Sequence, residues 1–382
     1  MADMIGMRVR ERLSELHPTK TQAEVAAAVK MTPDALSRAL NNQRQFATLE
    51  LVRLANYLQT SMHWLATGEP DPAATRVAAR HTFDAQALRH ETVDWSNERT
   101  AIETVAAAFT QAFREAPPRA LPPVPVSPAE ARAMLSQHNV DFVRSFAESV
   151  EAVFGVEVVR IPEATRPYSI EVVGRRLIVV PPHVNWFHQN FSIAHELGHF
   201  ATGNLEAIEA APAASWQAEA SANAYAIELL LPADTMRSVD WSSMAAADIA
   251  NNLWHWGVST DAVKRRLAFL SIIPGDEVRE VLNMTTQRAL RRHWTHNDSS
   301  MWVDSITDRM DRANTRRFPT ELIRAHMEGV ADGRLRPTYL AWILGTDPAE
   351  LESELSPGDD SPDLDWLMGE VGLQQQSPLT QS

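Results

Sequence analysis

The chain of 382 residues contains no cysteine. Composition therefore excludes disulfides, iron–sulfur clusters and thiolate metal sites, and any bound metal must use His, Asp or Glu side chains. Long apolar runs are also missing: no stretch of about eighteen residues is apolar enough to span a bilayer. No charged start is followed by an apolar core and a cleavage site. These absences indicate a cytoplasmic protein.

An excess of positive charge is missing too, since 35 Lys and Arg stand against 49 Asp and Glu, for a net charge of −14. Phosphate binding needs local positive charge, so the composition argues against a nucleic-acid surface along the whole chain. Residues 1–70 differ, because they hold eight basic and seven acidic side chains. The acidity therefore lies downstream of this first segment.

Proline, glycine and β-branched residues divide the chain. Gly68-Glu-Pro-Asp-Pro72 cannot continue a helix and ends the first segment. Six prolines within 117–128 predict an extended spacer after one helix at about 99–115. A helix at 141–154 then precedes short β-branched runs, which predict a small sheet. These runs are residues 156–161, 169–173 and 176–180.

Two short helices joined by a tight connection are predicted within residues 21–42. Thr21 is a helix N-cap with Glu24 completing a capping box, and Thr32 followed by Pro33 starts the second helix. Apolar residues on both helices would pack them at a steep angle. The residues left outward on the second helix can reach base edges or phosphates: Asp34, Ser37, Arg38 and Asn41.

This segment resembles the Cro/CI-type (XRE) helix-turn-helix family over about residues 4–68. The resemblance implies that Gln22 touches a phosphate and that Arg38 and Asn41 face the major groove, with Arg44 a further phosphate contact. It also implies a double-stranded DNA operator and a homodimer on two half-sites. Pro33 stands where a base-reading Gln is common, so the operator is not predicted. The alternative is a packing module that has lost DNA binding.

The stretch FSIAHELGHF, residues 191–200, carries a second motif. Side chains four apart share a helix face, so His195 and His199 can present nitrogens to one metal ion. Glu196 then lies where it can take a proton from water at that ion. A helix at about 216–232 offers Glu219 as a third ligand and Asn223 one turn later.

Over about residues 135–270 the chain resembles the ImmA/IrrE family of metallopeptidases. The family pattern is a HELGH helix followed by a Glu-x-x-x-Asn helix, with Tyr225 here replacing Phe and Leu231 replacing Met. The match implies Zn²⁺ held by His195, His199 and Glu219, with Glu196 as general base. Asn223 would orient a ligand.

Several alternatives to this interpretation stay open. The two histidines could be core residues, the metal could be purely structural, and Glu228 or Glu206 could replace Glu219 as ligand. The sequence does not choose an oxyanion-stabilising residue. The available side chains are Tyr168, His183, His188 and His255.

The C-terminal third is less informative. Seven arginines within 288–317 are interleaved with Asp298, Asp304, Asp308 and Asp311. This pattern favours a solvated, salt-bridged helix face over a second nucleic-acid surface. Residues 333–351 suggest a partner-binding or dimerisation module, and an acidic tail follows.

Together these features predict a multidomain, mainly α protein. An all-α helix-turn-helix head would precede an α+β zincin-like metallopeptidase domain with a small sheet and a helical C-terminal unit. The expected boundaries are 1–70, a linker at 71–128, the peptidase domain at 129–273, the helical unit at 274–356 and a disordered tail at 357–382. The two family resemblances imply a DNA-binding transcriptional regulator whose zinc endopeptidase domain makes limited cuts in a partner regulator, which would be a repressor or antitoxin-like protein. The alternative is a non-catalytic transcription factor or antitoxin that uses the peptidase fold as a sensor or docking body.

Overall fold

The computed structural model describes residues 5–15, 20–58, 60, 62–68, 76–79, 83–84, 89–90, 96–114, 122–203, 212–295 and 305–355. The chain divides into two compact units, residues 1–74 and 75–382. Among the described helices, none is both long and apolar enough to cross a membrane. The predicted acidic tail at 357–382 lies outside the described residues.

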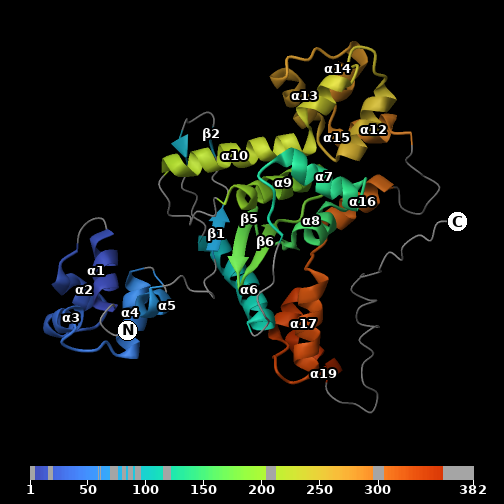
Figure 1. Cartoon of the computed structure of the whole chain (residues 1–382). Helices are drawn as coiled ribbons and strands as arrows, with labels where there is room; N and C mark the ends of the chain where they lie inside the picture. The colour runs from blue at the N-terminus through green and yellow to red at the C-terminus, as the bar shows by residue number, and fades with distance from the viewer. Residues whose placement is uncertain are drawn as a thin grey trace. The chain divides into compact units, whose positions relative to one another are not determined.

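The first unit is a bundle of short helices (Figure 1): α1 (Ile5–Glu15), α2 (Gln22–Ala28), α3 (Pro33–Leu40), α4 (Thr48–Tyr57) and α5 (Met62–Thr67). Thr21 forms the predicted capping box with Glu24, and Thr32 caps α3. Val25, Leu36 and Leu54 are buried in its core. A Cβ on Gly6 would lie 2.6 Å from the carbonyl oxygen of Leu40, so the close approach of α1 to α3 requires glycine.

A four-stranded sheet with the order β1-β5-β6-β4 lies at the centre of the second unit. The predicted runs form β4 (Val156–Arg160), β5 (Tyr168–Val172) and β6 (Arg175–Val180), and β1 (Arg76–Ala79) adds a fourth strand next to β5. Strands β4 and β6 are parallel, whereas β5 and β6 form an antiparallel hairpin. The predicted small sheet is thus confirmed, and the unpredicted strand comes from the stretch assigned to a linker. Strands β2 (Phe83–Asp84) and β3 (Arg89–His90) pair separately.

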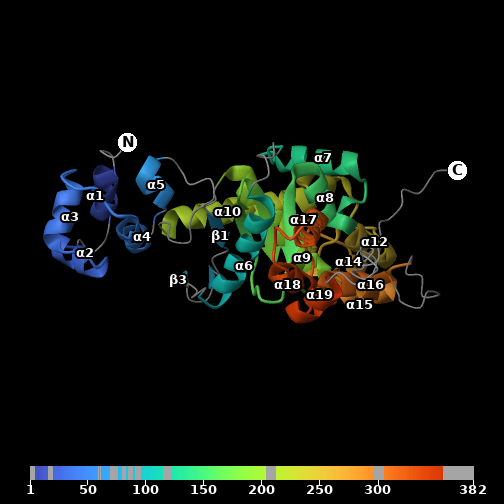
Figure 2. The ribbon, with the colours of Figure 1, turned by 90° about the horizontal axis from the view of Figure 1, so that it is seen from below.

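Alternating side chains of the sheet point into two hydrophobic cores. One core contains Val158 and Ile178 together with α7 (Pro128–His138), η2 (Phe142–Ser145), α8 (Phe146–Phe154), α9 (Trp186–Thr202) and α10 (Pro212–Leu230). The other contains Leu177 and Val179 together with α6 (Ser96–Phe113), α17 (Thr320–Ala331) and α18 (Thr338–Leu344). The sheet is therefore covered on both faces, and Figure 2 shows α6 and α17 on the second face.

Further helices complete the first of these cores: α11 (Ala233–Ser238), α12 (Ala246–Trp256), α13 (Thr260–Phe269), α14 (Asp276–Leu282), α15 (Thr286–His293) and α16 (Ser305–Asn314). Helix α19 (Pro348–Leu355) adds Leu351 to the second core. Helices that the sequence assigns to a linker and to a separate C-terminal unit therefore share cores with the sheet. The physical reason is that α6, α17 and α18 bury the sheet face that α9 leaves open.

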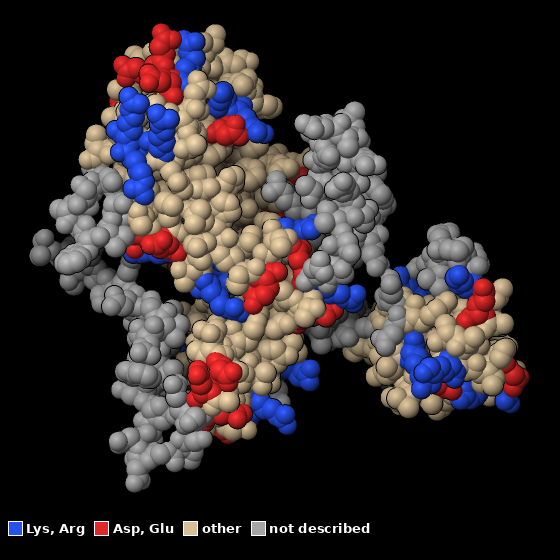
Figure 3. Space-filling view, turned by 180° about the vertical axis from the view of Figure 1, so that it is seen from behind, with Lys and Arg blue, Asp and Glu red and all other residues tan. Residues whose placement is uncertain are grey.

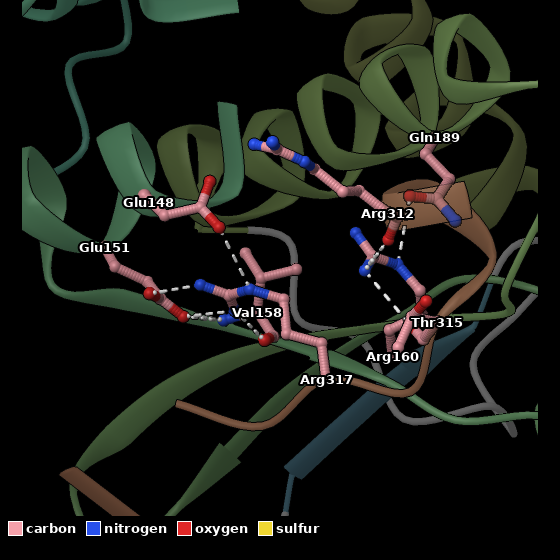
Figure 4. Close-up of polar contacts among 8 residues, drawn as sticks. All are labelled: Glu148, Glu151, Val158, Arg160, Gln189, Arg312, Thr315 and Arg317. Atoms are coloured by element: carbon pink, nitrogen blue, oxygen red, sulfur yellow. Dashed lines mark hydrogen bonds and ion pairs between the residues drawn. The ribbon is translucent and has the colours of Figure 1, made fainter. Parts of the chain in front are cut away.

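A polar network ties the segment between α16 and α17 to the edge strand β4 (Figure 4). The backbones of Arg160 and Arg317 exchange two hydrogen bonds, of 2.8 and 2.9 Å. The Arg160 guanidinium donates to Gln189 of α9 at 3.1 Å and to the carbonyl oxygens of Arg312 and Thr315. Arg317 forms an ion pair with Glu151 of α8 at 2.7 Å. These contacts make the C-terminal helices part of the second unit.

Candidate metal centre and candidate nucleic-acid interface

The candidate metal centre lies between α9 and α10, which pack side by side (Figure 1). Helix α9 carries the HELGH motif on a segment that is buried from Ile193 to Ala201. Gly203 ends it in the left-handed region, with a φ of 69°. Gly198 faces α10, and a Cβ there would lie 3.0 Å from the Cα of Ala222 and 3.1 Å from the Cβ of Tyr225. The close approach of the two helices therefore depends on a residue without a side chain.

His195, His199 and Glu219 offer ligand atoms that all lie within 4.8 Å of one another. The Nε2 atoms of the two histidines are 3.2 Å apart. Carboxylate oxygens of Glu219 lie 3.2 Å from His195 Nε2 and 3.5 Å from His199 Nε2. A tetrahedral ion about 2.1 Å from each ligand would hold two ligand atoms about 3.4 Å apart. The three side chains thus fit zinc in both chemistry and spacing.

The charge state of Glu219 suits a ligand. Burial raises the pKa of its carboxyl, but hydrogen bonds to His195 and His199 and the charges of these two residues outweigh burial, so the pKa is lowered to about 2. A metal ligand must be deprotonated. Glu219 is therefore a carboxylate at neutral pH.

Asn223 contacts one of the three candidate ligands. Its Oδ1 lies 3.0 Å from Nδ1 of His195, and because an amide oxygen only accepts, Nδ1 must carry the proton. Nε2 of His195, on the side of His199 and Glu219, is therefore the nitrogen that can bind a metal once it has lost its proton. The contact has the partner atoms that the predicted orienting role of Asn223 requires, and that role stays a prediction.

Glu196 is fully buried beside the ligand set. Its Oε2 accepts a hydrogen bond of 2.7 Å from the hydroxyl of Ser169 in β5. Its Oε1 is buried without a hydrogen-bond partner among the described residues. A buried carboxylate oxygen without a partner is costly, and water at a bound ion would provide the missing donor. This orphaned atom is a second reason why the residues present fit a metal.

The structure gives most of the alternative residues other partners. Glu228 forms an ion pair with Arg266 and accepts from the backbone nitrogen of Ala233 at 2.9 Å, and Glu206 lies outside the described residues. Tyr168 donates to Glu98 from a fully buried position.

The candidate histidines for oxyanion stabilisation also have other contacts. His183 accepts from the backbone nitrogen of Asn185 at 2.9 Å, and His255 lies 3.6 Å from Asp141. His188 lines a groove of about 1190 Å³ between α9, α10 and α13. Two of the three histidines thus have other partners, and the role of His188 stays open.

Sequence reasoning missed Ser169, although its hydroxyl contacts the predicted general base. Along β5 the alternating residues Ile170 and Val172 are buried in the second core, which turns Ser169 toward α9 in the first. The only signal in the sequence is a lone serine at an inward position of a β-branched run.

In the first unit, most of the predicted DNA contacts are at the surface. Gln22, Asp34, Arg38 and Asn41 are exposed, and Ser37 and Arg44 are partly exposed. Two of these cations already have partners, because Arg38 pairs with Asp34 at 2.9 Å and Arg44 with Glu50 at 2.7 Å. A phosphate would have to displace these carboxylates, so the individual contacts stay predictions.

Comparison with known proteins agrees with both motifs. Residues 19–65 match the family model described as helix-turn-helix, and residues 151–268 match the model described as IrrE N-terminal-like domain, a peptidase family. Neither the curated proteins nor the solved structures contain a match to the chain. The chain therefore combines an XRE-type helix-turn-helix domain with an IrrE-like domain of the M78 peptidase family.

Proposed function

We propose that this chain is a DNA-binding transcriptional regulator whose second unit is a zinc endopeptidase, and that it makes limited cuts in a partner regulator. The observation that carries the proposal is the cluster of two buried histidines, His195 and His199, with the partly buried Glu219, next to the buried carboxylate of Glu196. A purely structural site has no need of a buried carboxylate with an unpaired oxygen. The helix-turn-helix domain supports an operator as the second partner.

The residues of the site would divide the work of peptide hydrolysis. A zinc ion held by His195, His199 and Glu219 would acidify water and polarise a peptide carbonyl. Glu196 would accept one proton from water while the water oxygen bonds to the carbonyl carbon of the peptide. It would then give that proton to the amine nitrogen as the C–N bond breaks. Ser169 would hold Glu196 in place through Oε2, so that Oε1 faces the proton. Asn223 would keep His195 in the tautomer that binds metal.

Metal content and cleavage should be measured on the same purified proteins: wild type, Glu219→Gln, Glu196→Gln and Glu228→Gln. We expect about one zinc per chain in all except Glu219→Gln, which would lose the third ligand. Glu228→Gln should keep its zinc because Glu228 pairs with Arg266. Each protein is then incubated with regulator proteins purified from the cells in which this chain naturally occurs. Wild type and Glu228→Gln should cut a partner, whereas Glu196→Gln should bind zinc and not cut.

Three results would count against the proposal. Wild type without zinc would remove the peptidase function and leave a DNA-binding regulator. Zinc that persists in Glu219→Gln would place the third ligand elsewhere. A stable complex of zinc-loaded wild type with an uncut partner would identify the second unit as a docking body.

A further inference from the structure

The seven arginines within 288–317 fall into two groups in the structure. Those from 309 onward are engaged: Arg309 is buried and donates to the carbonyl oxygens of Val143 and Trp254. Arg312 pairs with Asp308 at 2.9 Å, Arg316 with Glu163 at 3.3 Å and Arg317 with Glu151 at 2.7 Å. Of these four, Arg312 fits the expected salt-bridged helix face, because it pairs with an interleaved aspartate. Arg316 and Arg317 pair instead with glutamates far away in the sequence, and Arg309 is a core residue.

The other three, Arg288, Arg291 and Arg292, are exposed on α15. Their i, i+3 and i+4 spacing places them on one helix face. Helix α15 contains no acidic residue. In the part of the chain that the structure describes, neither Arg288 nor Arg292 forms an ion pair, while Arg291 donates to the hydroxyl of Thr307 at 3.0 Å. In Figure 3, Lys and Arg side chains gather on the part of the second unit that holds α12 to α15 in Figure 1, and acidic side chains lie next to them.

Helix α15 is a rigid platform for these side chains. Thr286, Ala289 and Leu290 are buried on its inner face, and Thr285 caps its first turn. Gln287 donates to Asn185 at the start of α9, at 2.6 Å. Immediately after the helix, the Trp294 ring stacks on Trp254 with centroids 4.0 Å apart. A fixed backbone lowers the entropy lost when the exposed side chains bind a ligand.

Two of the three acidic residues on the neighbouring helix α14 have other contacts, and the third, Glu280, is exposed. Asp276 pairs with Arg279, and Glu277 accepts from the backbone nitrogen of Ala246 at 3.0 Å. An open hollow of about 470 Å³ lies beside α15 and is lined by Thr285, Gln287, Arg288, Arg291 and Arg292. Guanidinium, amide and hydroxyl groups are the side chains that contact nucleic-acid phosphates. The hollow thus has the composition of an anion-binding surface.

We propose that α15 is a second DNA-binding surface of this chain, which takes the phosphate backbone of a duplex without reading its bases. DNA is favoured over an acidic protein because the same chain carries a helix-turn-helix domain and so works where duplex DNA is at hand. A duplex presents one negative charge per about 1.7 Å of axis, so Arg288 and Arg292, which lie about one helical turn apart, can each find a phosphate. Arg291 adds positive charge between them. The net charge of −14 is compatible with this, since screening limits repulsion to about 10 Å.

The test compares the full-length wild type with R288Q/R291Q/R292Q on a fluorescein-labelled DNA duplex of arbitrary sequence, by anisotropy over a range of salt concentrations. Each lost phosphate contact should reduce the slope of log K against log salt by about 0.9, so the triple variant should lose between about 2 and 3 units of slope. The matched control is R324Q/R334Q/R336Q, which removes the same charge from exposed sites on and after α17. The control should keep the slope of wild type.

The outcomes distinguish DNA binding at α15 from a general charge effect and from the binding of another partner. An unchanged slope in the α15 variant would overturn the proposal, and so would an equal loss in the control, which would indicate a general charge effect. A loss that is larger on an RNA duplex, or for polyglutamate as competitor, would assign the surface to another partner. As a direct readout, the DNA duplex should protect Arg288 and Arg292 of wild type from phenylglyoxal, mapped by mass spectrometry; equal modification with and without DNA would contradict the proposal. None of these readouts depends on zinc or on peptide cleavage.

Discussion

The hydroxyl of Ser169 donates a hydrogen bond of 2.7 Å to Oε2 of Glu196 and also lies 3.1 Å from the Glu196 carbonyl oxygen. Both residues are fully buried. One hydroxyl on the sheet therefore sets the position of the carboxylate that the proposed mechanism uses as general base. Because Ser169 touches none of the three candidate ligands in the described structure, its effect on chemistry can be separated from metal binding.

We expect Ser169→Ala to lower kcat by about 10- to 100-fold while KM and zinc content stay close to wild type. The physical reason is that Glu196 loses the donor that holds it in one rotamer. The matched control is Ser149→Ala. Ser149 of α8 is also buried, but its hydroxyl donates to the carbonyl oxygen of Phe142 in η2 and not to Glu196. Equal losses of kcat in both variants would show that Ser169 acts only through stability.

Gly198→Ala should weaken both zinc binding and folding. The new methyl group would meet the backbone of Ala222 at 3.0 Å, so α9 and α10 must separate. Glu219 lies on α10 one turn before Ala222, so the separation would move it away from the two histidines on α9. Overpacking of this kind costs about 1–3 kcal/mol of unfolding free energy. Zinc affinity is measured by competition with a chromophoric chelator, and stability by urea unfolding of the metal-free protein.

The control for this change is Gly329→Ala in α17, where the new methyl group meets the side chain of Leu335. This variant should lose stability but keep the zinc affinity of wild type. If Gly198→Ala keeps wild-type zinc affinity as well, the helix separation does not set the ligand geometry.

The residues of the candidate metal centre could be predicted from the sequence better than the side chains around them, for a physical reason. His195 and His199 share a face because one helix has a fixed period, so their spacing alone brings them together. The orientation of Ser169 toward Glu196 depends on which face of the sheet α9 covers, and periodicity within one strand does not determine that. The same holds for the arginines: interleaved acidic residues suggested pairing throughout, but Arg288 and Arg292, which form no ion pair within the described residues, lie on a helix without acidic residues.

Contacts that join distant parts of the chain were also out of reach. Residues 160 and 317 pair although about half of the second unit separates them in the sequence, and nothing in either local sequence indicates the other. The consequence was the assignment of α6 and α17 to separate segments, although both pack on the sheet.

Arg317→Met should destabilise the second unit by about 3–5 kcal/mol, because it leaves Glu151 without the cation that pairs with it in a mostly buried site. The methionine keeps much of the apolar volume, so the loss reports the polar contacts of Arg317 with Glu151, Glu148 and the carbonyl oxygen of Val158, and not a cavity. Arg312→Met is the control, since its pair with Asp308 is exposed and such pairs contribute about 1 kcal/mol or less. Urea unfolding followed by tryptophan fluorescence measures both, and equal values would show that the pair with Glu151 is not structurally important.

The last prediction concerns the helix-turn-helix domain and uses two arginines in like surroundings. Arg38 in α3 pairs with Asp34 and Arg99 in α6 pairs with Glu103, each exposed and four residues from its partner. If α3 enters the major groove, Arg38→Ala should weaken binding to a duplex selected from a random pool by about 1–3 kcal/mol, whereas Arg99→Ala should leave it unchanged. Anisotropy with that duplex gives both affinities. Because the two substitutions remove the same charge and the same kind of ion pair, a loss in Arg38→Ala alone assigns the effect to DNA contact. Equal affinities for wild type and Arg38→Ala would instead favour a packing module without this contact.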